Sequence, residues 1–376
     1  MYKIGIIDHV GHKSGMDIYD MSLSTKLCKN AEVHLLSNFE TNSNLISQLK
    51  VRKIFNTADE GKSAISKAKY FFKGFWKAFK YLNKNKCKTI ILHSFSFEYK
   101  DLIICLLAKA WNFKTLLIVH DVSGFAKNDS TFVKRIILNR LTTKILVHNK
   151  FSKDAIIGEV EDTKKIITVR HGGYTDYVNS SITKLEAYAE LKLDPGFRYI
   201  LFFGQIKEVK GLDLLIEAFG KLTSEKVKLI IAGKPWKDDF SKYEKLINDY
   251  NLNKLVVLFK RFIPDSEKDL LFAASDVVVI PYKKIFQSGV LLTALSYPCV
   301  VLCSDLEPNM EVIKSGENGF LFETNNIDSL ASMLTSILNE NSEKIKQIKD
   351  NALKTVKTDY SWDYAAEIII KNLTND

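Results

Sequence analysis

The sequence of 376 residues lacks any apolar run long enough to cross a membrane. A spanning helix needs about 20 consecutive apolar residues. The longest candidate, residues 102–111, is short and contains Lys109. We also expect no secretory leader, because residues 2–10, YKIGIIDHV, read as a first core strand. The sequence therefore predicts a protein of the cytosol.

Cysteine is scarce, and its placement argues against a disulfide or metal framework. An odd number of cysteines lies at scattered spacings on apolar segments, namely Cys28, Cys87, Cys105, Cys299 and Cys303. No histidine stands near Cys299 and Cys303, as a zinc site would require. An Asp-x-Asp pair on a suitable loop is missing too, and Asp238 with Asp239 lies in a lysine-rich turn. We expect buried thiols, no metal and no cofactor.

Acidic residues are missing from one long stretch near the N-terminus. Residues 61–90 hold nine lysines and no acid, and residues 1–180 hold 29 Lys+Arg against 16 Asp+Glu, although the whole chain carries only +10. Helical spacing places large aromatic side chains on one face of this stretch and lysines on the remainder.

Two interpretations of this basic helix compete. In the first, the aromatic face of the helix packs on the first domain and the lysines are only solvated. In the second, the helix lies on a membrane and its lysines contact anionic headgroups. We favour the membrane interpretation, because packing against the domain does not require a stretch that carries only positive charges together with several large aromatic side chains. The predicted membrane contacts are Lys73, Phe75, Trp76, Lys77 and Lys80.

Arginine is almost absent from the same basic patch. Nucleic-acid readers use the bidentate arginine fork on base edges, so a nucleic-acid partner is not expected.

Length and periodicity predict two domains of one class. The chain exceeds the size at which a single core stops growing, and 46% hydrophobic residues can fill two cores. Short apolar runs alternate with helical segments in both halves, which is typical of parallel sheets covered on both faces. We therefore expect an α/β protein with two doubly wound sheets. Three strand ends of the first half carry a histidine, at His93, His120 and His148.

The stretch YILFFGQIKEVKGLDLLIEAF, residues 199–219, joins an apolar strand to a helix through a glycine turn. Gly204 lets the backbone approach a ligand, the helix after Gly211 points amides at an anion, and Lys207 with Lys210 supplies charge. A diphosphate site for a nucleotide is the prediction. An ordinary strand-turn-helix with solvated lysines is the alternative.

The order of the later segments resembles the C-terminal domain of GT-B glycosyltransferases, specifically family 4, which uses nucleotide-sugar donors. The resemblance covers residues 195–365 and includes KLIIAGKP from Lys228 and SGVLLTAL from Ser288. It implies two Rossmann-like domains facing across a cleft. Residues 1–180 would bind the acceptor, residues 181–355 the nucleotide sugar, and residues 356–376 would form a helix that crosses back. A linker is expected at about residues 179–196.

The resemblance also implies a set of donor-binding residues. These are Gly204, Gln205 where an arginine is usual, Lys207, Lys210, Gly233, Ser288, Gly289, Val290, Leu291, Thr293 and Glu311. The family usually carries two glutamates eight positions apart, but Ile285 and Thr293 stand there. Thr293 could still make one neutral hydrogen bond to a ribose, and Glu311 braces its loop. Retention is implied by the family, while the missing glutamates leave inversion open.

In the first domain the resemblance points to His120, in IVHDVSG, as the histidine placed against the transferred sugar. A single histidine is more often structural. The expected catalytic set is His120, Asp121 and Lys210, with either of the first two as general base if the reaction inverts. The loop GHKSGM resembles the family's glycine loop, so Gly11, Gly15 and His93 are expected on the acceptor side. Arg170 and His171, in the expected domain junction, either face the cleft or cap a strand.

The expected activity is transfer of a hexose from a nucleotide diphosphate sugar to a glycan acceptor. A lipid-linked acceptor fits the basic helix best, which places the protein at the inner face of the cytosolic membrane in cell-surface polysaccharide synthesis. Two alternatives stay open. One is a GT-B scaffold with a weakened donor site, and the other is a sugar-nucleotide epimerase, which would need neither an acceptor nor a basic surface.

Overall fold

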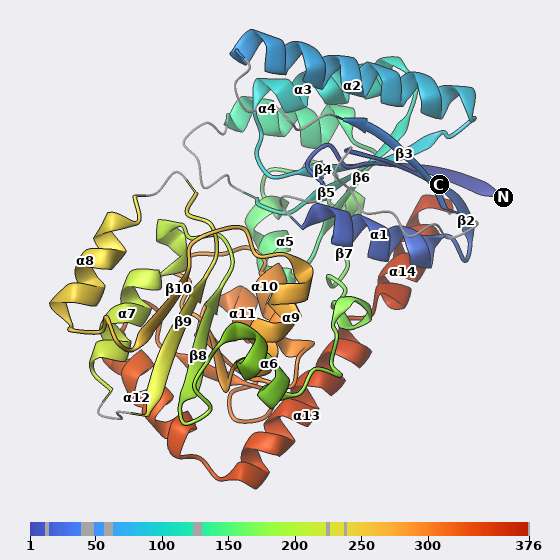
Figure 1. Cartoon of the computed structure of the whole chain (residues 1–376). Coiled ribbons are helices and arrows are strands. Elements are labelled where there is room, and N and C mark those ends of the chain that lie inside the picture. Colours follow the sequence, from blue (N-terminus) through green and yellow to red (C-terminus); the bar gives the residue numbers. More distant parts are fainter. Residues whose placement is uncertain are drawn as a thin grey trace. The chain divides into compact units, whose positions relative to one another are not determined.

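The computed structural model describes residues 1–11, 15–38, 49–55, 63–122, 130–222, 226–236 and 239–374. The chain forms two compact units (Figure 1). Unit 1 contains Met1–Gly172 and Tyr360–Asp376, and unit 2 contains Gly173–Asp359. The junctions therefore follow Gly172 and Asp359, whereas the sequence placed them after residues 180 and 355.

Within its described residues, unit 1 holds a parallel sheet of seven strands in the order β3-β2-β1-β4-β5-β6-β7. The strands are β1 (Tyr2–Ile7), β2 (Ala31–Asn38), β3 (Leu49–Phe55), β4 (Thr89–Ser94), β5 (Lys114–Val119), β6 (Lys144–Val147) and β7 (Ile166–Thr168). Strands β1, β4, β5 and β6 are buried along most of their length, as expected for a sheet covered on both faces. The predicted first core strand is confirmed as β1, and the three strands predicted to end in a histidine are confirmed as β4, β5 and β6.

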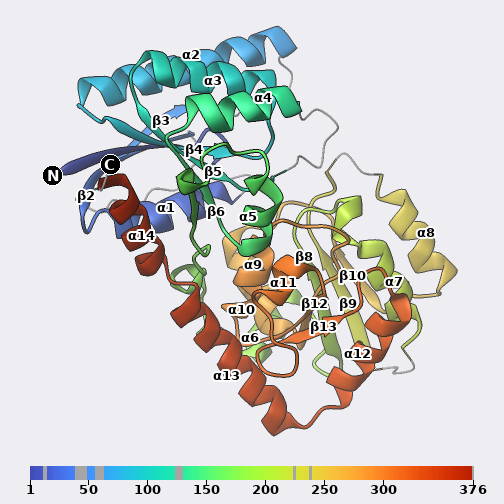
Figure 2. The ribbon, with the colours of Figure 1, turned by 180° about the vertical axis from the view of Figure 1, so that it is seen from behind.

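Helices cover both faces of this sheet. They are α1 (Met16–Leu27), α2 (Ala64–Lys84), α3 (Tyr99–Ala110), α4 (Thr131–Ile136), α5 (Lys150–Ile157) and α14 (Trp362–Thr374). Helices α2, α3 and α4 lie on one face, and α1 and α14 lie together on the other (Figures 1 and 2). Lys26 of α1 and Lys29, which follows this helix, pair with Asp363, and the Tyr2 hydroxyl donates to the Leu373 carbonyl at 3.0 Å. The C-terminal segment thus belongs to unit 1.

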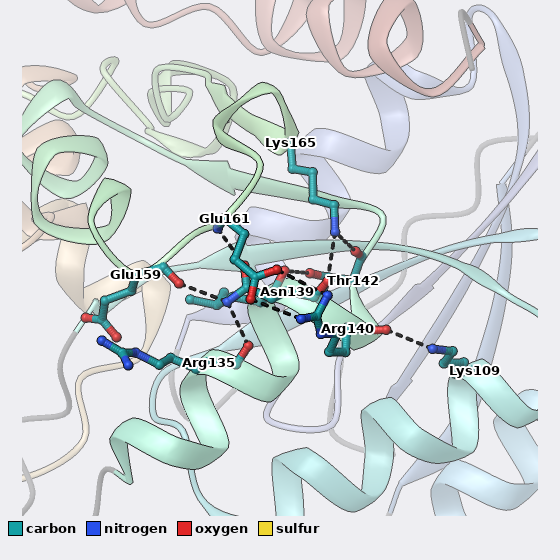
Figure 3. A network of polar contacts seen from close by, with 9 residues as sticks. Lys109, Arg135, Asn139, Arg140, Thr142, Glu159, Glu161 and Lys165 are labelled. Carbon is teal, nitrogen blue, oxygen red and sulfur yellow. Dashed lines mark hydrogen bonds and ion pairs between the residues drawn. The ribbon is translucent and has the colours of Figure 1, made fainter.

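A single π-helical turn, Ile137–Leu141, extends α4 and needs outside partners for its carbonyls. Lys109 donates to the Arg140 carbonyl at 3.0 Å, and Lys165 donates to those of Asn139 and Thr142 at 3.1 and 3.3 Å (Figure 3). The Arg140 guanidinium holds both carboxylate oxygens of Glu161. This network ties the turn to the segment between α5 and β7.

The face that α2 buries corrects one membrane prediction. Phe75 is only 3% exposed and packs against Phe55, Phe71 and Phe79. Its neighbour Trp76 is 52% exposed. Successive side chains point about 100° apart around a helix, so two adjacent aromatic side chains can face different surroundings. The assignment of Phe75 to a membrane was wrong because its ring belongs to the core of unit 1.

Unit 2 is built on a second parallel sheet, with six strands among its described residues in the order β10-β9-β8-β11-β12-β13. The strands are β8 (Arg198–Phe203), β9 (Val227–Ala232), β10 (Val256–Phe259), β11 (Val277–Ile280), β12 (Val300–Ser304) and β13 (Phe320–Phe322). The helices are α6 (Lys184–Leu191), α7 (Leu212–Gly220), α8 (Ser241–Asp249), α9 (Asp265–Ala274), α10 (Gly289–Leu295), α11 (Glu307–Met310), α12 (Ile327–Asn339) and α13 (Ser342–Asp359).

Alternate side chains of each strand in unit 2 fill two separate cores. Ile200 and Phe202 join the core beneath α7, α8 and α12, while Tyr199 and Leu201 join the core beneath α6, α9 and α10. The same alternation holds in β9, β11 and β12. Period-two side chains buried on both faces leave no polar position inside these strands, so polar chemistry is confined to their ends.

Helix α6 occupies the predicted linker at residues 179–196. The Thr183 hydroxyl accepts from the Glu186 amide, and the Glu186 carboxylate accepts from the Thr183 amide. This reciprocal pair fixes a helix start, so the linker prediction was wrong over this turn.

Two further expectations concern membrane-spanning helices and the cysteines. No helix in the described parts of the chain combines the length and hydropathy of a membrane span. All five cysteines are buried and free, as predicted.

The burial of α2 predicts that adjacent aromatics differ in their contribution to stability. Phe75→Ala should lower the free energy of unfolding by about 3 kcal/mol or more, because it leaves a cavity among packed rings. Trp76→Ala should lower it by less than about 1 kcal/mol. Urea denaturation of both variants measures the difference, and equal losses would contradict the buried face assigned to α2.

Candidate functional site

Each sheet has a position where the chain changes the direction in which it adds strands. In unit 2 this position lies between β8 and β11, and in unit 1 between β1 and β4. Ligands of doubly wound sheets bind beyond the carboxyl ends of the strands at such positions. We therefore describe the strand ends of each unit by itself.

The turn after β8 depends on close backbone contacts. Gly211 has φ 65°, and a Cβ there would lie 1.8 Å from the Pro281 carbonyl oxygen. Gly233 has φ 159°, and a Cβ there would lie 1.8 Å from the Gly204 carbonyl oxygen. Only glycine fits at both positions. The turn after β8 is thereby held against the ends of β9 and β11.

Aromatic rings beneath the turn position its two lysines. The Lys210 ammonium lies 3.6 Å from the centre of the Tyr282 ring, and the Lys207 ammonium lies 4.2 Å from that of Trp236. Tyr282 is buried, whereas Trp236 is 45% exposed. A cation over a ring face is stabilised by the ring quadrupole, more so where water is excluded. Sequence reasoning missed both rings, although each follows a predicted strand end.

The segment around α10 adjoins the same turn. Val290 lies 3.4 Å from the position of a Cβ on Gly204, and Ser288, which is buried, accepts from the Leu291 amide at 3.1 Å. The Thr293 hydroxyl donates to the Gly289 carbonyl at 2.8 Å. The structure therefore brings the β8 turn and the start of α10 together.

The remaining donor-side predictions divide by burial. Ile285 is buried in the core of unit 2 and offers no polar atom in place of the missing glutamate. Gln205 is exposed beside the turn, and Glu311 is exposed at the end of α11. One further residue was missed by sequence reasoning. Tyr174 has its hydroxyl 3.6 Å from the position of a Cβ on Gly289.

In unit 1 the strand ends converge on a cluster of histidines around Tyr19 of α1. The Tyr19 ring contacts those of His93, His120, His148 and His171, with centroids 4.9 to 5.7 Å apart. The predicted histidines at the ends of β4, β5 and β6 therefore meet.

Hydrogen bonds set the orientation of these rings. His93 Nδ1 lies 2.9 Å from His120 Nε2. His148 Nδ1 donates to the Val169 carbonyl at 2.9 Å, so its Nε2 accepts from the Tyr19 hydroxyl at 3.1 Å. His171 Nδ1 donates to the Gly172 carbonyl at 2.7 Å. His171 is buried while Arg170 is exposed, so the two junction residues differ in role.

Two buried carboxylates adjoin the histidines, and sequence reasoning missed both. Asp20 of α1 is fully buried, with Oδ1 3.0 Å from His93 Nε2. Asp8, at the end of β1, accepts from the amides of Val10 and Gly11 at 2.9 and 2.7 Å. Burial, together with the charge of Asp20, raises the pKa of Asp8 to about 6.

Burial keeps most of the imidazoles neutral. It lowers the pKa of His148 to about 3 and that of His171 to about 4. It likewise lowers the pKa of His9, which packs among Phe55, Phe71 and Phe75, to about 4. A strongly basic unit therefore keeps these three imidazoles uncharged.

The other acceptor-side predictions lie at the edge of this cluster. Gly11 is buried beside Asn38, and Gly15 precedes α1 with φ 74°. Residues 12–14 of the predicted glycine loop lie outside the described residues, as does Asp238. Asp121 follows His120 and is half-buried. No three His, Cys, Asp or Glu side chains among the described residues are arranged to hold a metal ion.

Comparisons with known proteins show similarity in sequence and in fold. The family model described as "Glycosyl transferases group 1" matches residues 183–355. Granule-bound starch synthase 1 of Pisum sativum is 27% identical over 202 residues, which are 51% of this chain and 32% of that protein.

Two further similarities extend over the whole chain. An N-acetylgalactosamine-N,N'-diacetylbacillosaminyl-diphospho-undecaprenol 4-alpha-N-acetylgalactosaminyltransferase of Campylobacter jejuni is 25% identical over 368 residues, which are 94% of each chain. The crystal structure of Anabaena HepE with UDP and glucose has a TM-score of 0.80 at 18% identity and covers 100% of both chains.

The fold defined by these two units is that of the GT-B glycosyltransferases, as predicted. Residues 183–355 match the glycosyl transferases group 1 model, which agrees with the resemblance at that level. Membership of family 4 stays a prediction. The chain spans 32% of the length of the Pisum sativum starch synthase and 50% of that of spore coat protein SA of Bacillus subtilis, to which it is 25% identical.

The buried neutral histidines predict loss of stability in acid. His9, His148 and His171 take up a proton on unfolding below a pKa of about 6.5, whereas the folded protein binds it only near pH 3 to 4. Stability should therefore fall as pH decreases from about 6.5 to 4, by about 1.4 kcal/mol per pH unit for each histidine. Asp8, whose pKa is raised, opposes this between about pH 4 and 6 by binding its proton more tightly when folded.

Urea unfolding between pH 7 and pH 5 measures this slope. His148→Gln should reduce the slope of stability against pH by the contribution of one histidine, because glutamine does not titrate. The difference between the two pH values is the readout, so a general loss of stability in the variant does not affect it. An unchanged slope would contradict the neutral state assigned to His148.

Proposed function

We propose that this protein is a glycosyltransferase that moves a hexose from a nucleotide diphosphate sugar to a glycan acceptor. The observation that carries the proposal is the position of Lys207 and Lys210. Both lie beyond the carboxyl end of β8, beside the change of direction in the sheet, within the group 1 domain. Ligands of this type of sheet bind at that position.

Lys210 is proposed to neutralise the diphosphate as it departs. Charge develops on the leaving group in the transition state, so a cation already fixed in place stabilises that state more than the ground state. The ring of Tyr282 at 3.6 Å holds the ammonium, and Lys207 over Trp236 adds a second charge. The diphosphate is a good leaving group, so positioning and electrostatics suffice without a covalent intermediate.

Donor recognition is proposed to rely on backbone amides and neutral groups. The glycines Gly204 and Gly233 permit close approach, and Ser288, Gly289, Val290 and Leu291 form the adjoining turn. The Thr293 hydroxyl donates to a carbonyl, so toward a ribose it can act only as an acceptor. Gln205 and Glu311 complete the proposed donor set.

The acceptor is proposed to be a lipid-linked glycan. The Campylobacter relative, similar over 94% of both chains, acts by its name on a sugar carried by diphospho-undecaprenol. The exposed surface of α2 fits such an acceptor, because Lys73, Lys77 and Lys80 are exposed beside Trp76. Tyr99 of α3 and Phe132 of α4, each 67% exposed, extend apolar surface on the helices that cover the same face of the sheet. Peripheral association with an anionic membrane follows as part of the proposal.

The second candidate is a GT-B scaffold without transfer activity. The observation that favours it is the position of Ile285, whose apolar side chain is buried where a donor-site glutamate is usual. The two candidates differ in what Lys210 does, so one variant separates them.

Lys210→Ala should lower transfer by about 100-fold or more, because it removes a charge from the leaving diphosphate. Thermal shift with UDP, GDP and ADP first identifies the nucleotide, and turnover of the matching nucleotide sugars is then measured. Lys245→Ala, an exposed lysine of α8, is the control and should match the parent. Unchanged turnover in folded Lys210→Ala would contradict the donor site, and no turnover in any parent assay would favour the scaffold.

The exposed lysines of α2 should govern membrane binding. Replacing Lys73, Lys77 and Lys80 with glutamine should weaken binding to anionic vesicles by up to about 100-fold at low salt, since each contributes about 1 kcal/mol. The loss should shrink as salt rises. Trp76→Ser should weaken binding at every salt concentration.

Sedimentation with phosphatidylserine vesicles tests this prediction. The matched control replaces three exposed lysines of unit 2, Lys245, Lys254 and Lys346, with glutamine. Parent protein that ignores the vesicles, or two triple variants that bind alike, would contradict a membrane role for α2.

A further inference from the structure

A buried ion pair between Asp20 and His93 adjoins His120, the histidine that is expected beside the sugar. Asp20 of α1 is fully buried, and its Oδ1 lies 3.0 Å from Nε2 of His93, whose side chain is 2% exposed. A carboxylate removed from water is costly unless a cation or hydrogen bonds compensate for it. A proton on His93 Nε2 therefore compensates for the buried charge of Asp20.

The second nitrogen of His93 reaches the expected sugar-side histidine. His93 Nδ1 lies 2.9 Å from His120 Nε2, so one of these two nitrogens donates and the other accepts. If His93 is protonated on both nitrogens, it donates and His120 must carry its own proton on Nδ1. If His93 is neutral, His120 donates and its Nδ1 becomes a free base. The two cases give His120 opposite chemistry.

The surroundings of the two rings decide between these cases. The titratable groups facing His93 are Asp20 and Tyr19 of α1, Asp8 and His9 after β1, and His120 after β5. Two of them are carboxylates, which favour a charged His93. His120 instead faces the imidazoles of His93, His148 and His171, which disfavour a charge on it.

The pKa directions agree with these surroundings. Burial lowers the pKa of His93, but the charge and hydrogen bonding of Asp20 and then the charge of Asp8 outweigh it, so the pKa is raised. Burial and the three neighbouring imidazoles lower the pKa of His120 well below its ordinary value.

The His120 ring is also fixed in its plane. Phe95 stacks on it with centroids 4.7 Å apart at 8°, and Tyr19 meets it edge-on at 5.3 Å. Its Nδ1 makes no hydrogen bond within the described part of the chain, and the residue is half-buried. His93 therefore hydrogen-bonds to Nε2 of His120, and Nδ1 of His120 is left to contact a bound molecule.

We propose that Asp20 and His93 are positioning residues that hold His120 as the neutral tautomer with its proton on Nδ1. His120 then donates a hydrogen bond to an oxygen of the bound sugar and does not act as a base. The sugar as ligand rests on the proposed function, whereas the tautomer is a property of the chain alone. If the transfer inverts, the general base must be another group, and Asp121 is the remaining candidate.

Nitrogen-15 NMR of the histidine-labelled full chain, without ligand, tests the tautomer from pH 5.5 to 8.5. His93 should be protonated on both nitrogens at pH 7, and His120 should show a proton on Nδ1 and a bare Nε2. Asp20→Asn should make His93 titrate at lower pH and shift His120 toward the Nε2–H form. A parent His120 that carries its proton on Nε2, or an Asp20→Asn spectrum like the parent's, would overturn the proposal.

Activity gives an independent second test once turnover is measured. His93→Gln keeps an N–H donor for His120 Nε2, whereas His93→Leu does not, so glutamine should retain about tenfold more kcat/KM than leucine. Equal activity of these two folded variants would contradict a positioning role. The NMR result stands without turnover, so failure of the proposed function is distinguishable from failure of this inference.

Discussion

Helices bury both faces of each parallel sheet, and this burial limits where polar side chains can lie. Strands such as β4, β5, β8 and β11 are apolar along their length because helices cover both sides. In these four strands the polar side chains lie at the strand ends or next to them. The histidine cluster of unit 1 and the lysine turn of unit 2 both occupy such ends, so each collects residues that are far apart in the chain.

The two units handle charge in opposite ways. In unit 2, aromatic faces hold two lysine cations at the proposed diphosphate site, where a permanent charge suits a departing anion. In unit 1, four imidazoles meet around one tyrosine, and burial keeps three of them neutral. In the proposed arrangement the proton lies on His93, which pairs with the buried carboxylate of Asp20. Three neutral imidazoles and an ion pair whose charges compensate each other present directed hydrogen bonds without a net charge toward a ligand.

Much of the fold could be predicted from periodicity, and the misses have identifiable causes. Strand β3 was not predicted, because only the first and last residues of this edge strand, Leu49 and Phe55, are buried, and charged residues interrupt the apolar run between them. A linker was predicted where helix α6 lies, although Thr183 and Glu186 form the sequence pattern of a capping box. At the site, the glycine turn with Lys210 was predictable, since its residues are contiguous. The other site residues were not predictable, since only folding brings them to the site from distant parts of the chain: Tyr282, Trp236, Asp8 and Asp20.

The sequence by itself determined the alternation of strands and helices, the basic character of α2 and the position of the lysine turn, because these depend on residues close together in the chain. The tertiary structure decided which of two adjacent aromatics is buried, since Phe75 and Trp76 differ only in direction around the helix axis. It also decided the protonation of the histidines. An imidazole pKa depends on burial and on the nearest charges, and those come from α1 and from neighbouring strand ends that only folding brings together.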